Sequence, residues 1–70
     1  KPTYPQVTVF TDAEIQKIKN IYTKAKQRGQ HHIILRLSLQ ITKVTHIKTE
    51  QKPIHFIDTV IKDYNYYTQQ

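Results

Sequence analysis

The sequence contains no cysteine and only one glycine among its 70 residues. Without cysteine, the chain can form no disulfide framework and has no thiolate for catalysis or metal binding. Small secreted domains usually depend on disulfides, so we expect a reducing, cytoplasmic setting. The single glycine, Gly29, excludes a glycine-rich loop of the kind that holds phosphates in nucleotide-binding enzymes.

Long apolar runs are also missing. The longest strongly apolar run is Ile33-Ile34-Leu35, which Arg36 ends. Because a membrane-spanning helix needs about 20 such residues, we expect no membrane partner. The sequence starts at Lys1 instead of Met and has no apolar leader, so we interpret it as one domain cut from a longer protein.

Acidic residues are scarce as well. The chain has five Asp and Glu residues and eleven Lys and Arg residues, which gives a formal net charge of +6. Such an excess favours a polyanion or an acidic protein as partner. The alternative is an ordinary solvated surface, and the composition does not choose between the two.

The first ten residues show no helical periodicity. Pro2 and Pro5 prevent a regular start, and residues 6–9 have weak strand character. We therefore expect an irregular arm at residues 1–10. It is either the remainder of a linker or a segment that docks across the helices.

The clearest helix signal follows this arm. Thr11 is a good N-cap, and Glu14 stands three residues later, as a capping box requires. From Ile15 onward, apolar residues recur every three or four positions. Gly29 marks the end, so the pattern predicts a helix at about residues 12–27.

The next segment fits two structures. A helical stripe is formed by Ile34, Leu37, Ile41 and Val44, but every second residue from 33 to 41 is also apolar, as in a strand. The β-branched residues after Ile41 favour a strand. However, no turn residue interrupts the segment, and a strand of this length needs partners that so short a chain hardly supplies. We predict a helix at about residues 31–45, with a strand at 33–47 as the alternative.

A third helix starts at Pro53, whose missing N–H costs nothing in the first turn. A wide apolar stripe follows, made of Phe56, Ile57, Val60, Ile61 and Tyr64. The pattern predicts a helix at residues 53–64 or slightly beyond. The fold class is therefore all-α, a small three-helix bundle with a helical interaction domain at residues 11–67 and a tail at 68–70.

Catalytic chemistry has little support in the sequence. Asp12 and Glu14 are explained by the helix start, and Asp58 and Asp63 are spaced to project in different directions. The four histidines lack the i, i+4 spacing of a helical metal site. We predict no enzyme, no cofactor, no metal and no small-molecule substrate.

Basic and aromatic side chains are the better candidates for function. Strips of lysine and arginine on a helix can follow phosphates or meet an acidic protein. Tyrosines near lysines can stack on bases or anchor an interface. The candidate contacts with DNA or a partner are Lys17, Lys24, Lys26, Arg28, Arg36, Lys43, Lys48, Lys52, Tyr66 and Tyr67.

Phe56, Val60 and Tyr64 stand at four-residue intervals in the third helix. This aromatic–aliphatic–aromatic spacing resembles the end of DnaD-like domains, where tyrosine, isoleucine and tryptophan occupy the three positions. The layout of two helices, Lys-Pro-Ile and a further helix is similar to the C-terminal domain of RepA_N-type plasmid replication initiators of Gram-positive bacteria. The chain has no tryptophan, so the match over residues 11–67 is one of residue type and spacing.

The resemblance implies a DnaD-like bundle in which Phe56, Val60 and Tyr64 are signature packing positions. In that family, a separate winged-helix domain recognises the origin, and the C-terminal domain recruits host replication proteins such as primase or helicase-loading machinery. In DnaD the corresponding module also contributes to DNA binding. The alternative function is therefore a basic helical domain that binds DNA directly through phosphate contacts.

Overall fold

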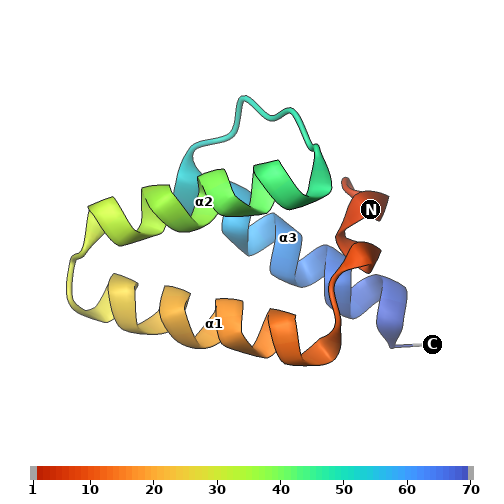
Figure 1. Cartoon of the computed structure of the whole chain (residues 1–70), viewed down its shortest axis with the longest axis horizontal. Coiled ribbons are helices and arrows are strands. Elements are labelled where there is room, and N and C mark those ends of the chain that lie inside the picture. Colours follow the sequence, from red (N-terminus) through yellow and green to blue (C-terminus); the bar gives the residue numbers. More distant parts are fainter. Residues whose placement is uncertain (1, 70) are drawn as a thin grey trace.

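Three α-helices and a short N-terminal 3-10 helix make up the computed structural model, which describes residues 2–69 (Figure 1). The elements are η1 (Pro5–Val9), α1 (Asp12–Gln27), α2 (His31–Thr45) and α3 (Pro53–Thr68). Helices α1 and α2 run side by side in opposite directions, and α3 passes behind α2. No strand occurs between residues 2 and 69. The all-α prediction is confirmed, and the segment that also fits a strand is a helix.

Helix α1 begins at the capping box that the sequence indicates. The Glu14 backbone N–H donates to Thr11 Oγ1 at 3.1 Å, and the Thr11 N–H donates to Glu14 Oε1 at 2.8 Å. Phe10 and Ile15 on either side of the cap are buried, as a hydrophobic staple requires. At the other end Gly29 adopts a left-handed φ of 64°, which costs glycine little and lets the chain turn back into α2.

Helix α2 faces the core with a stripe that overlaps the predicted one but is centred differently. Its buried residues are Ile34, Ser38, Ile41 and Thr45. Leu37 is half-buried and packs against the core, as predicted, but Val44 is 50% exposed, so its place in the core stripe is wrong. The helix is apolar on three sides, and periodicity alone could not say which side turns inward.

The buried hydroxyls of α2 are satisfied within the helix itself. Ser38 Oγ donates to the Leu35 carbonyl at 2.7 Å, and Thr45 Oγ1 donates to the Ile41 carbonyl at 2.7 Å. Such back-bonding removes most of the cost of burying a hydroxyl. At the end of α2, His46 adopts a left-handed φ of 61° and its N–H donates to the Thr42 carbonyl at 2.8 Å.

Helix α3 supplies the centre of the core. Phe56, Ile57 and Val60 are at most 1% exposed, and Tyr64 is buried beside them. The helix continues to Thr68, whose Oγ1 donates to the Tyr64 carbonyl at 2.7 Å. It is thus four residues longer than 53–64.

The N-terminal arm docks across the helices instead of forming a strand. Pro5 starts the 3-10 helix η1, and Val7 within it is completely buried. The backbone N–H groups of Thr3 and Tyr4 both donate to Asp63 Oδ2 of α3, at 2.7 and 2.5 Å. The expected strand character at residues 6–9 is wrong, because the arm finds its backbone partners on a helix and no sheet edge lies beside it.

Tyr4 ties the arm to two further parts of the fold. Its ring meets Phe56 edge-on, with 5.5 Å between the ring centroids. Its hydroxyl donates to Gln51 Oε1 at 2.6 Å and lies 2.9 Å from Thr49 Oγ1. Both polar partners belong to residues 46–52, the α2–α3 linker. The arm therefore holds this linker in place through the Tyr4 hydroxyl.

No helix within residues 2–69 is both long enough and apolar enough to cross a membrane.

We expect Ile57→Ala to lower the free energy of unfolding by about 2–5 kcal/mol, because it leaves a cavity at the centre of the core. Urea unfolding followed by circular dichroism measures this loss. Leu39→Ala is the matched control, since Leu39 is a helical aliphatic residue that is 60% exposed. Equal losses for the two variants would contradict the assigned core.

We expect Asp63→Ala to release the arm, because the Thr3 and Tyr4 N–H groups lose their acceptor. Amide hydrogen exchange at these two positions then accelerates about tenfold or more, since charge-assisted bonds are the stronger kind. Asp63→Asn keeps one acceptor oxygen and gives an intermediate rate. Unchanged exchange at Thr3 and Tyr4 in Asp63→Ala would show that the carboxylate does not anchor the arm.

Candidate functional site

The acidic side chains of α1 and α3 are occupied by contacts inside the domain. Asp63 anchors the arm and Glu14 caps α1. Asp58 Oδ1 accepts a hydrogen bond from the Tyr22 hydroxyl at 2.7 Å, and Asp12 accepts one from the Tyr64 hydroxyl. These carboxylates are therefore fixed on α1 and α3. Helix α2 has no acidic residue at all.

The two tyrosines that face carboxylates are stabilised in their protonated form. Burial, with the Asp58 carboxylate adding to it, raises the pKa of Tyr22 far above its ordinary value. The hydrogen bond to Asp12, with partial burial, raises the pKa of Tyr64. Tyr22 also donates to the Ile54 carbonyl at 3.1 Å, so it joins α1 to the first turn of α3.

An apolar groove runs along α2 on the side of the α2–α3 linker, and we call it the α2–linker groove. Leu35 and Leu39, one helical turn apart, form one wall and are 50% and 60% exposed. Ile47 and Phe56 are buried at its base. A second apolar depression adjoins the groove, since Leu35 and Pro53 line both; its other residues are His31, Ile34, Lys52, Ile54 and His55, and we count it as the far end of the α2–linker groove.

Basic side chains border the α2–linker groove on both sides. Lys48 and Lys52 line it from the linker. On α2, Arg36 and Lys43 are exposed and stand three residues before and four residues after Leu39, which makes them its neighbours on the helix surface. The structure thus places two of the predicted contact residues, Lys48 and Lys52, on an apolar strip that the sequence analysis did not associate with them. Arg36 and Lys43 lie next to its α2 wall by helical spacing.

The predicted contacts on α1 lie elsewhere. Lys17, Lys24 and Arg28 are exposed along one side of α1. Ile21, between them, lines a second, smaller groove between α1 and α2 with Ile33, Leu37, Arg36 and Gln40. Arg36 therefore stands between the two grooves.

Lys26 has a contact within the domain. Its Nζ lies 4.7 Å from the centroid of the Tyr22 ring. At an exposed site, such a cation–π contact is worth about 0.5–1 kcal/mol. The spacing of four residues between Tyr22 and Lys26 is the sequence signal that could have revealed this pair.

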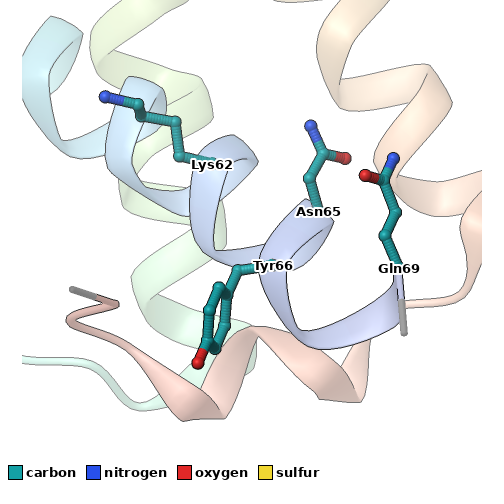
Figure 2. A pocket seen from close by; sticks show the side chains of 4 residues that line it. All are labelled: Lys62, Asn65, Tyr66 and Gln69. Carbon is teal, nitrogen blue, oxygen red and sulfur yellow. The ribbon is translucent and has the colours of Figure 1, made fainter.

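Tyr66 and Tyr67 lie in the last turns of α3, away from α2. Their rings meet edge-on, with centroids 5.2 Å apart. Tyr66 lines a surface depression with Lys62, Asn65 and Gln69. Figure 2 shows that the Asn65 and Gln69 amides extend one way, Tyr66 another, and Lys62 away from all three. Because these groups do not converge, nothing in this depression would orient a ligand.

The histidines do not assemble into a metal centre in the described part of the chain. No group of three or more His, Cys, Asp or Glu residues within residues 2–69 could hold a metal ion. His31 and His55 line the far end of the α2–linker groove, and His46 ends α2. The three signature positions, Phe56, Val60 and Tyr64, lie in the core.

The whole chain, residues 1–70, matches the family described as Domain of unknown function (DUF8484). No curated protein and no solved structure matches the chain. The family description names no activity or ligand, so the surface of the domain is the source of inference about function.

We expect Tyr22→Phe to lower the free energy of unfolding by about 1–2 kcal/mol at neutral pH, because the hydroxyl proton shared between Asp58 Oδ1 and the Ile54 carbonyl is lost. The raised pKa adds a pH dependence to this difference. The unfolded chain releases the Tyr22 proton near pH 10, about the ordinary value, whereas the folded chain keeps it.

Above about pH 10 the unfolded state therefore binds fewer protons, and the wild-type protein loses this part of its stability. The difference between wild type and Tyr22→Phe shrinks as the pH rises. Urea unfolding of both proteins between about pH 8 and about pH 11 measures it. A constant difference over that range would contradict the assigned environment of Tyr22.

Proposed function

The chain belongs to the DUF8484 family, and we propose that it is a non-catalytic protein-recruitment module that docks a partner in its α2–linker groove. One observation carries this proposal. Leu35 and Leu39 remain at least half exposed, side by side, although α2 buries a serine and a threonine instead. Contiguous exposed apolar side chains with a polar rim mark interaction sites, whereas scattered ones do not.

Covering the two leucines supplies a useful share of binding energy. Complete burial of one leucine side chain is worth roughly 1.5–3 kcal/mol. Covering the exposed half of both therefore contributes about 1.5–3 kcal/mol in total. This corresponds to about a ten- to a hundredfold change in Kd.

The biological setting that we propose is replication initiation. It rests on the resemblance of Phe56, Val60 and Tyr64 to the end of DnaD-like domains in plasmid replication initiators. In this setting, the module recruits a host replication protein, such as primase or a helicase loader, to the origin. All three residues are buried, which supports a packing role for this spacing.

Direct DNA binding is the second candidate, and α1 provides the observation in its favour. Lys17, Lys24 and Arg28 are exposed on one side of α1 and could follow a phosphate backbone. Each phosphate neutralised in this way makes binding fall more steeply with salt. This strip does not include the two leucines, so the two functions depend on different residues.

We expect the double variant Leu35→Ser, Leu39→Ser to bind its replication partner at least about tenfold more weakly, since the apolar wall of the groove is lost. Surface plasmon resonance with purified primase and purified helicase-loading proteins of a Gram-positive host measures this effect. Val44→Ser is the matched control, because Val44 is 50% exposed on the same helix but outside the groove.

Two outcomes count against recruitment through this groove. One is binding by the double variant with wild-type affinity. The other is the absence of binding to these replication proteins together with tight binding to random duplex DNA that weakens steeply with salt. In the second case, substitution of Lys17, Lys24 and Arg28 by alanine would remove the DNA binding and establish the α1 strip as the site.

A further inference from the structure

We infer that the occupant of the α2–linker groove is an amphipathic helix of the partner with carboxylates along both edges of its apolar stripe. The inference rests on the proposed function and names the chemistry of the segment that docks.

The length of the groove matches a short helix. Together with the adjoining depression, its lining on α2 runs from His31 to Thr42. At 1.5 Å per residue this stretch is about 16 Å long, or about three helical turns. Leu35 and Leu39 are one turn apart, the same spacing as apolar residues at i and i+4 of a partner helix. Such a helix can place one apolar side chain on each side of each leucine.

The other common modes of peptide binding lack a surface here. Residues 2–69 contain no strand, so this part of the chain offers no sheet edge to which an extended peptide could add. Proline-rich ligands need an exposed aromatic platform, but Phe56, the aromatic residue of the groove, is only 1% exposed. A helix laid into an apolar groove is the mode that remains.

The charges along the borders select an acidic helix. Lys48 and Lys52 line the groove from the linker. On α2, the exposed Arg36 and Lys43 lie beside Leu39 at helical spacing, next to the groove wall. Glu50 is the acidic residue of the linker and offsets one of these charges. Carboxylates on both edges of a docked helix would meet opposite charge, which favours the correct partner and speeds its association.

The same borders disfavour two other occupants. A second copy of this chain would bring Arg36 and Lys43 against lysines and arginines like themselves, and like charges in an interface are costly. Duplex DNA would satisfy the cations, but its phosphates offer nothing apolar to cover Leu35 and Leu39. An acidic amphipathic helix satisfies both the leucines and the cations.

The test uses three synthetic peptides of about three to four turns with the same leucine stripe. The first carries glutamate on both flanks, the second carries glutamine at those positions, and the third is the acidic peptide with a central proline that breaks the helix. Fluorescence anisotropy with labelled peptide and the whole chain gives the affinities at low and high salt.

We expect the acidic peptide to bind about tenfold more tightly than the glutamine peptide at low salt, from several exposed pairs of modest strength each. High salt reduces this advantage. Lys48→Glu with Lys52→Glu abolishes the preference for the acidic peptide. Lys17→Glu with Lys24→Glu makes the same change of charge on α1, away from the groove, and preserves the preference.

The inference is overturned if the glutamine or the proline peptide binds as well as the acidic one. It is also overturned if the double variant Leu35→Ser, Leu39→Ser binds the acidic peptide as tightly as the wild type does. A third contrary outcome is tight binding of duplex DNA that this leucine variant keeps and the double variant Lys48→Glu, Lys52→Glu loses. If the replication protein depends on the leucines but the acidic peptide does not bind, recruitment stands and the acidic helix is wrong. If neither depends on the leucines, both proposals fall.

Discussion

The hydrogen bonds of Ser38 and Thr45 to carbonyls of their own helix allow α2 to turn these residues toward the core, and the outer surface of the domain depends on that orientation. A hydroxyl that is satisfied locally can face the core without a partner on another helix. Helix α2 therefore packs through Ile34, Ser38, Ile41 and Thr45. Leu35 and Leu39 are left at the edge of the interface, where they form the wall of the α2–linker groove. A helix turned to bury these leucines would have no such groove.

Local signals in the sequence were enough to place the helices. The capping box at Thr11, the glycine after α1 and Pro53 at the start of α3 are each recognised from a few adjacent residues. The boundaries of α1 agree with the structure for this reason, whereas α2 was separated from a strand by the lack of strand partners in so short a chain. Helix α3 runs on to Thr68 because the tail has no residue that ends a helix.

Contacts between distant residues could not be predicted in the same way. The bond from the Tyr4 N–H to Asp63 joins positions 59 residues apart, and no local pattern indicates it. The rotation of α2 was hidden because leucine, isoleucine and valine occur on three of its sides. Individual cations were recognised as candidates, but that Lys48 and Lys52 of the linker lie across from Leu35 and Leu39 of α2 follows only from the folded chain.

Tyr4 couples the docking of the N-terminal arm to the ordering of the α2–α3 linker. Its hydroxyl donates to Gln51, 47 residues away, while its backbone N–H is bonded to Asp63. Thr49 and Gln51 both line the α2–linker groove. By thermodynamic reciprocity, a ligand that steadies this wall also favours the docked arm, and an arm drawn away weakens the wall to the same extent in free energy. Mechanical tension that pulls the N-terminus away from Asp63 would therefore lower the affinity of the α2–linker groove for its ligand.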